Sequence, residues 1–299
     1  MRPYLFILLS LILTINTSAQ TFDQLNRVSN ATIDAYYSDG HQQRAAAITQ
    51  RMEKALTYHE HLLGFRPTVT LLILAPSDWN KYTKLSMIYG MPHYTSEKTL
   101  IVAAEDNAFW KSFVPPMDQL PVALRDQIYK VYTTEDSSLS MRAFFDLLAI
   151  HELAHAFHMQ GNIGMQRKWM GELFANIFLH TYISNNEPAS LPALTLFPEM
   201  VVASGTEGFL FTSLSDIQER YAEIGQQYPR NYGWYQCRWH VAAAAVYNSG
   251  GTEVCGKLWK VLRKQKESLS DDELNDLLEI EVDKTLAEII RHWDRDTVK

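Results

Sequence analysis

Residues 140–160 read SMRAFFDLLAIHELAHAFHMQ, and this stretch decides the fold because it joins a buried helix to a metal-binding pattern. Its apolar residues recur at helical spacing without a glycine or proline, which predicts a largely buried helix. Within it, His151-Glu152-Leu153-Ala154-His155 forms an HExxH run. Residues four apart share a helix face, so His151 and His155 could bind one Zn²⁺ ion while Glu152 reaches a water on the metal.

A catalytic zinc site has three protein ligands and one open position, so a third ligand is needed. Residues 161–164 predict a turn, and a second helix is expected over about residues 166–182. Helices joined by so short a turn run antiparallel. The midpoint between His155 and Glu172 falls in the turn, so both side chains should lie at one height. The spacing therefore predicts a zinc site made by His151, His155 and Glu172.

The residues around Glu172 distinguish between two kinds of HExxH site. A site closed by a third histidine would need Gly at position 158 and His at position 161, whereas the chain has His158 and Gly161. The run Trp169-Met170-Gly171-Glu172-Leu173-Phe174-Ala175 instead resembles the Trp-x-x-Glu-x-x-Ala motif of the gluzincin metallopeptidases, particularly the peptidase MA-like domains of exported bacterial proteins. His158 itself is more typical of a hydrogen-bonded core residue than of a functional one.

The resemblance covers most of the chain beyond the N-terminus, and it implies further residues. Its members use a downstream tyrosine at the head of a helix to stabilise the oxyanion. Tyr235 is the first choice here, followed by Tyr232 and then His240. Some relatives carry an acidic residue four positions after the Glu ligand to orient a ligand histidine. This chain has Asn176 there, which adds no negative charge and implies a lower zinc affinity.

The function that these residues and the resemblance imply is zinc-dependent hydrolysis of peptide bonds. Glu152 would act as the general base on a zinc-activated water, and Tyr235 would donate to the oxyanion. Residues 90–93, Gly-Met-Pro-His, lack the carboxylate that related aminopeptidases use, so endopeptidase action is favoured. Two alternatives stay open: an inactive exported binding protein with a structural metal site, and a zinc hydrolase that acts on a non-peptide amide or ester.

The N-terminus indicates where the protein works, and the composition limits the kinds of partner that it binds. Residues 1–19 have the charged, apolar and small-residue parts of a signal peptide, which predicts cleavage near Ala19 and export to the periplasm or the medium. The apolar stretch is shorter than a membrane span, so no stable membrane insertion is expected after cleavage. A formal net charge of −7 disfavours nucleic acid and anionic lipid. The expected partner is a peptide or protein substrate.

Cys237 and Cys255 are the two cysteines of the chain. If they lie on antiparallel helices joined at Gly250-Gly251, their positions along the helix axes differ by roughly 14 Å. A disulfide needs Cα atoms within about 7 Å. We therefore expect two buried free thiols.

The remaining pattern predicts an α+β fold in two parts after the signal peptide. Over residues 20–139 a small N-terminal α/β subdomain is expected, with a helix at 42–63, a strand at 68–74, a helix near 77–88 and a strand at 99–104. The last strand is the expected sheet edge that borders the cleft and pairs with substrate. Residues 140–299 predict a mainly helical, zincin-like catalytic subdomain.

Overall fold

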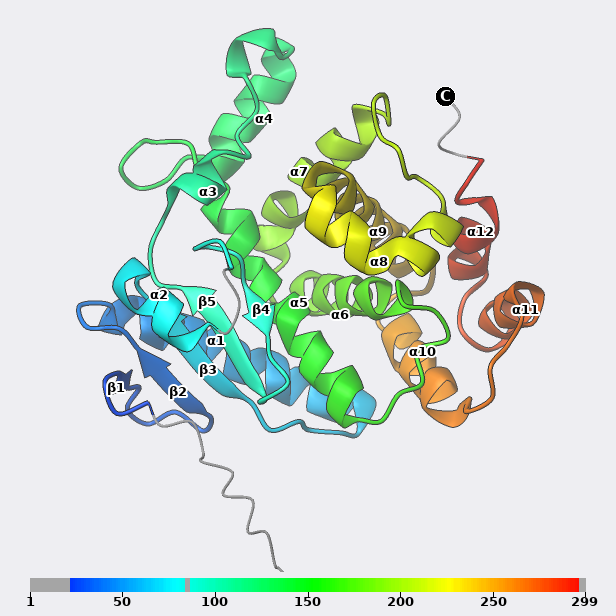
Figure 1. The fold of residues 1–299 in the computed structure, drawn as a ribbon, viewed down its shortest axis with the longest axis horizontal. Helices are drawn as coiled ribbons and strands as arrows, with labels where there is room; N and C mark the ends of the chain where they lie inside the picture. Colours follow the sequence, from blue (N-terminus) through cyan, green and yellow to red (C-terminus); the bar gives the residue numbers. More distant parts are fainter. Residues whose placement is uncertain (1–21, 84–86, 296–299) are drawn as a thin grey trace, which may run out of the picture.

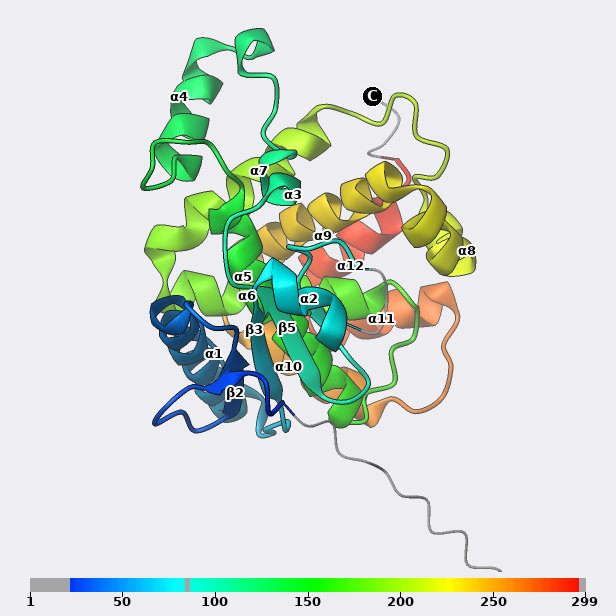
Figure 2. The same cartoon turned by 60° about the vertical axis from the view of Figure 1, so that its left-hand side comes forward.

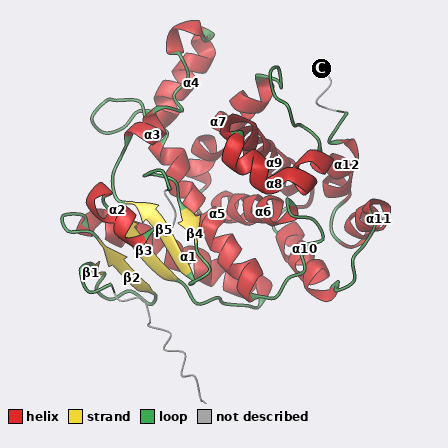
Figure 3. Ribbon diagram, in the orientation of Figure 1, coloured by secondary structure: helices red, strands yellow, loops and turns green. Residues whose placement is uncertain are grey.

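A computed structural model describes residues 22–83 and 87–295 of the chain. The predicted signal peptide, residues 1–19, lies outside the described residues. The fold is α+β, with all strands at one side of the molecule and helices alone beyond α5 (Figures 1 and 3). The strands are β1 (Asn26–Arg27), β2 (Asp34–Tyr37), β3 (Thr70–Leu74), β4 (His93–Tyr94) and β5 (Thr99–Ala103). The helices are α1 (Gln42–Leu63), α2 (Pro76–Tyr82), α3 (Ala108–Lys111), α4 (Val122–Tyr132), α5 (Arg142–Gln160), α6 (Met170–Asn186), α7 (Leu191–Ala203), α8 (Leu214–Gln227), α9 (Pro229–Gly250), α10 (Glu253–Lys264), α11 (Asp271–Glu281) and α12 (Lys284–His292).

The five strands form one mixed sheet in the order β1-β2-β3-β5-β4. Strands β2, β3 and β5 are parallel, whereas β1 and β4 are antiparallel to their neighbours. Every residue of β5 is buried, as are four of the five in β3. Continuous apolar runs are typical of parallel strands that are covered on both faces. Helix α1 lies behind the sheet in Figure 1, and Figure 2 shows α4 projecting away from the body.

The prediction that residues 99–104 form the sheet edge is wrong. Strand β5 pairs with β3 on one side and with β4 on the other, so β4 is the edge. Tyr94 of β4 lies opposite Leu100 of β5. With only two residues, β4 is too short to produce the alternation by which a strand is recognised. The strand itself was predicted correctly, apart from its last residue.

Helix α1 has the bounds that the sequence predicts. Its buried residues, among them Ile48, Met52 and Leu56, recur at intervals of three or four and form one apolar face. Gly64 follows the helix with φ of +67°, and its N–H bonds back to the Glu60 carbonyl. Glycine is favoured at this position because a left-handed backbone is costly for residues that carry a Cβ.

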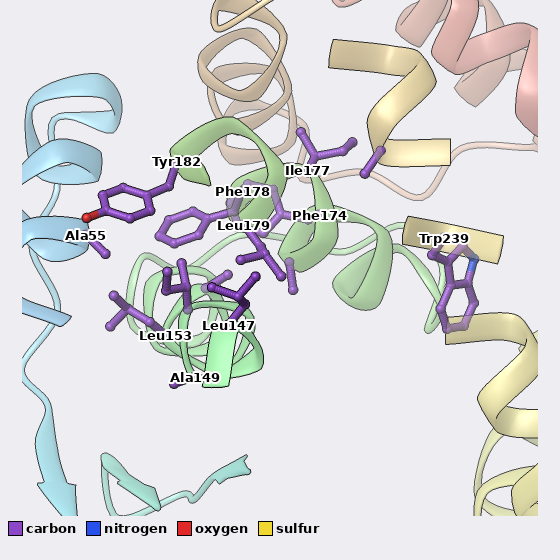
Figure 4. Close-up of a cluster of buried hydrophobic side chains, with 14 of the residues drawn as sticks. Ala55, Leu147, Ala149, Leu153, Phe174, Ile177, Phe178, Leu179, Tyr182 and Trp239 are labelled. Atoms are coloured by element: carbon purple, nitrogen blue, oxygen red, sulfur yellow. The ribbon is translucent and has the colours of Figure 1, made fainter. Parts of the chain in front are cut away.

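The core forms where α6 packs between α5 and α9. Residues 173–183 of α6 are all buried, so this helix is apolar on nearly every side, as expected for a helix enclosed by others. Figure 4 shows Leu147 and Leu153 of α5 facing Phe178 and Leu179 of α6. This packing fixes α5 against α6, and both helices carry predicted metal ligands.

Several helix ends differ from their predicted positions. Helix α2 ends at Tyr82, and Thr83 after it has an extended backbone. Helix α6 begins at Met170 and continues to Asn186, so it starts and ends about one turn later than predicted. Asp271 and the two acidic residues after it form the first turn of α11, and Ser270 caps this helix together with Glu273.

Cys237 and Cys255 are buried free thiols, which confirms their prediction. Burial raises the pKa of both thiols to about 12, so neither is ionised at neutral pH. Across the described ranges, no helix combines the length and the apolar composition that crossing a bilayer requires.

His59 predicts a dependence of stability on pH. It is fully buried on α1, its ring is stacked on Phe178 with centroids 3.3 Å apart, and burial holds its pKa well below the usual value. Below about pH 6.5 the unfolded chain therefore takes up a proton that the folded chain does not. We expect the free energy of unfolding to fall with decreasing pH, by up to about 1.4 kcal/mol per pH unit from this residue.

Urea unfolding at pH 7, 6 and 5 measures this effect. His59→Leu should reduce the slope of stability against pH, whereas His61→Leu, an exposed position on the same helix, should preserve it. Equal slopes for both variants and the parent chain would show that His59 is not responsible.

Candidate metal centre

Helix α5 presents His151 and His155 on one face, as their spacing predicts. Their Nε2 atoms lie 3.2 Å apart and point to a common position. The side chain of His151 is 7% exposed and that of His155 is 17% exposed, so both imidazoles are largely shielded from solvent. The rigid helix thus fixes the two imidazoles without any contribution from a loop.

Helix α6 brings Glu172 to this pair. Its Oε2 atom lies 3.1 Å from Nε2 of His151 and 3.8 Å from Nε2 of His155. Asn176, one turn later on α6, meets His151, one turn earlier on α5, so the two helices run in opposite directions as predicted. The three predicted ligands therefore converge.

The geometry of the three donor atoms fits a zinc ion. Zinc bonds of about 2.0–2.2 Å in a tetrahedral arrangement place neighbouring donors about 3.3 Å apart. The three donor separations here are 3.2, 3.1 and 3.8 Å. Within the described part of the chain, these three residues form the one cluster of histidine, cysteine or acidic side chains that could hold a metal ion. A tetrahedral ion would thus keep one position for water or substrate.

Two of the three ligands are already in the protonation state that a cation requires, whereas Glu172 raises the pKa of His151 against the effect of burial, so His151 holds a proton more readily than His155 does. Burial lowers the pKa of His155 to about 3, which leaves its imidazole neutral at pH 7. For Glu172, burial raises the pKa, but the opposing effects of His155, His151 and the Tyr221 hydroxyl together hold it below its usual value. Metal ligands must be unprotonated, so a neutral imidazole and an ionised carboxylate need no further proton loss.

Each imidazole has a hydrogen-bond partner behind it. The Nδ1 atom of His151 lies 3.2 Å from Oδ1 of Asn176, and Nδ1 of His155 lies 2.8 Å from Nε2 of His158. If both rings bind a metal through Nε2, their Nδ1–H groups donate to these partners. Asn176 therefore has the orienting position that its spacing from Glu172 predicts. His158 is hydrogen-bonded as predicted, and its partner is the predicted metal ligand His155.

The carboxylate of Glu172 is held by two residues that the sequence did not single out as part of the site. Tyr221 of α8 donates its hydroxyl to Oε1 at 2.6 Å, and Gln236 of α9 donates its amide N–H to Oε2 at 2.9 Å. Tyr221 directly follows Arg220, whose φ of −113° marks a kink in α8. Gln236 lies four residues after Tyr232, so helical spacing could have predicted that both side chains reach the site. No local sequence pattern predicts that Tyr221 does.

Tyr232 completes this group. Its hydroxyl lies 2.8 Å from Nε2 of Gln236 and 3.1 Å from the hydroxyl of Tyr221. Because Tyr221 gives its proton to Glu172, Tyr232 must donate to Tyr221 in this arrangement. Burial raises the pKa of Tyr232, so its hydroxyl stays protonated at neutral pH and can donate a hydrogen bond.

The structure places Tyr235, the first choice for the oxyanion residue, in contacts other than those with the three ligands. Helix α9 begins at Pro229, so Tyr235 lies in its second turn. Its hydroxyl donates to the Ser213 carbonyl at 2.7 Å, and its ring stacks on Trp293 with centroids 6.3 Å apart. Tyr232, the second choice, shares a helix face with Gln236 and reaches the site.

His240, the third choice, lies two turns beyond Tyr232 on the same face of α9. Its ring centroid is 6.4 Å from that of His151, and it packs against Phe144. Burial lowers its pKa well below the usual value, so it is neutral at pH 7. His240 forms part of the wall behind His151.

Glu152 lies beside the ligands and against the edge strand. Its Oε2 atom accepts the backbone N–H of Tyr94 in β4 at 3.0 Å. Burial is the main cause that raises the pKa of Glu152 to about 7. A carboxylate with a pKa near neutrality can take up and return a proton at pH 7, as a general base requires.

No family model, curated protein or solved structure matches the chain.

Proposed function

We propose that the protein is a zinc-dependent metallopeptidase of the gluzincin type, exported by the signal peptide predicted at residues 1–19. The observation that carries this proposal is the convergence of His151, His155 and Glu172, whose ligand atoms all lie within 4.8 Å of one another. Glu152 directly follows His151 and contacts the edge strand. On this proposal, the helices from α5 onward form a zincin-like catalytic subdomain beside the N-terminal sheet.

Bound zinc would supply a Lewis acid that polarises a carbonyl and lowers the pKa of a coordinated water from about 15.7 to about 7. Glu152 takes the proton from the attacking water and returns it to the leaving amine. Its raised pKa suits both transfers. Tyr232 donates its hydroxyl to the oxyanion once it releases Tyr221.

The position of β4 supports a peptide as the substrate. This strand is the edge of the sheet, and the Tyr94 N–H points away from β5, where the Glu152 carboxylate accepts it. An extended peptide can add to an edge strand through backbone hydrogen bonds. Such pairing would carry a scissile bond past Glu152 and the zinc ligands.

Casein cleavage by the purified chain tests the proposed function. We expect hydrolysis that a chelator stops and added zinc restores. A panel of amide and ester substrates in the same assay separates peptide hydrolysis from other zinc-assisted hydrolysis. Zinc-loaded protein that cleaves no peptide bond in casein or in a diverse peptide library would contradict the proposal.

Two tyrosines provide a further prediction about this site. Tyr232→Phe should lower kcat by about 10²-fold or more, because a donor to the oxyanion is lost. Tyr235→Phe should leave kcat unchanged and reduce stability by about 1 kcal/mol, because the Ser213 carbonyl loses its donor. Steady-state kinetics and urea unfolding on both variants measure these effects. The reverse pattern would restore Tyr235 to the mechanism.

A further inference from the structure

Among the residues that the structure describes, the side chains that hydrogen-bond to the three metal ligands from behind share one property: none is a carboxylate. His151 faces the amide oxygen of Asn176, and His155 faces the ring nitrogen of His158. That nitrogen must be unprotonated to accept from the Nδ1–H of His155, so this partner adds no charge through the contact. Protein zinc sites place a carboxylate, a backbone carbonyl or a water there, and among these partners the carboxylate brings a negative charge that raises the basicity of the imidazole.

The third ligand, Glu172, also has neutral hydrogen-bond partners. Tyr221 donates to one carboxylate oxygen of Glu172, and Gln236 donates to the other, which is also the oxygen nearest the imidazoles. Hydrogen-bond donors draw electron density from a carboxylate and compete with a metal for its lone pairs. Both donors are neutral, so they hold the orientation of Glu172 without adding charge.

We propose that this neutral layer of Asn176, His158, Tyr221 and Gln236 makes the zinc exchangeable, so that the metal content of the protein follows the free zinc around it. The inference rests on the proposed function and adds regulation to it. Removing or replacing such partners typically changes metal affinity by 10–100-fold. The four residues act as positioning residues, since they orient the ligands without reaching the metal.

Two substitutions test this proposal, and each introduces a negative charge behind one histidine ligand. Asn176→Asp changes one atom and keeps the shape of the side chain, and His158→Glu places a carboxylate near Nδ1 of His155. Asn185→Asp is the matched control: Asn185 lies on the same helix, and its amide bonds to the carbonyl four residues earlier just as that of Asn176 does. Zinc dissociation constants are measured on the purified full-length variants by competition with a chromophoric chelator.

We expect Asn176→Asp and His158→Glu each to bind zinc at least tenfold more tightly than the parent chain, with slower loss of zinc on dialysis. Asn185→Asp should bind it as the parent does. Equal or weaker binding by both carboxylate variants, in chains that unfold at the parent's temperature, would overturn the inference alone. A parent chain that binds no zinc would overturn the proposed function and this inference together.

Discussion

Glu152→Gln is expected to retain stoichiometric zinc while peptide hydrolysis falls by at least 10²–10⁴-fold, the contribution typical of a general base. The amide keeps the shape of the side chain but cannot accept a proton at neutral pH. It can still accept the Tyr94 N–H through its oxygen, so the edge strand should stay in place. The loss should therefore appear in kcat, with little change in KM.

Zinc content and steady-state kinetics on one preparation separate these effects. Glu199→Gln serves as the matched control, because it makes the same change at an exposed position on α7. Its kcat should equal that of the parent chain. Hydrolysis at the parental rate by a clean Glu152→Gln preparation would remove Glu152 from the role of base.

The second large effect concerns the ligands. His155→Ala is expected to abolish stoichiometric zinc binding and activity together, because two ligands cannot replace a site that needs three. His180→Ala makes the same substitution at another buried histidine of the core. Both variants open a cavity and lose stability, but only His155→Ala should lose the metal. Metal analysis after gel filtration, with circular dichroism to check the fold, measures this.

The outcome for His155→Ala also bears on its neighbour. If His158 replaced His155 as a ligand, the variant would keep its zinc, and the assigned site would be wrong. The Nε2 atom of His158 lies 2.8 Å from Nδ1 of His155, on the side of the His155 ring away from the other ligands. This position argues for full loss of the metal.

The sequence predicted the parts of the site that depend on short-range geometry. Helical spacing placed His151 and His155 on one face, and a turn between two helices placed Glu172 opposite them. The place of Asn176 followed from the resemblance, because some relatives carry an orienting residue four positions after the Glu ligand. These relations hold whenever the two helices form, because they depend on the regular geometry of the helix and on one short connection.

The predictions differ from the structure where tertiary contacts or short elements decide the outcome. Tyr235 was preferred because α9 was expected to start there, although Pro229 at the first helical position could have placed the start more than a turn earlier. Tyr221 enters the site through a kink at Arg220 and through packing of α8 on α9, and neither is encoded in a local pattern. The two residues of β4 likewise become the sheet edge only when they pair with β5.

On the proposed function, His151, His155 and Glu172 hold a single zinc ion with one position left open. A crystal structure of the zinc-loaded chain, with anomalous data at the zinc edge, tests this arrangement most directly. It should show one peak about 2.0–2.2 Å from both Nε2 atoms and from the Glu172 carboxylate, with no fourth protein ligand. A peak elsewhere, a Glu172 side chain turned away from the ion, or a fourth side chain closing the site would contradict it.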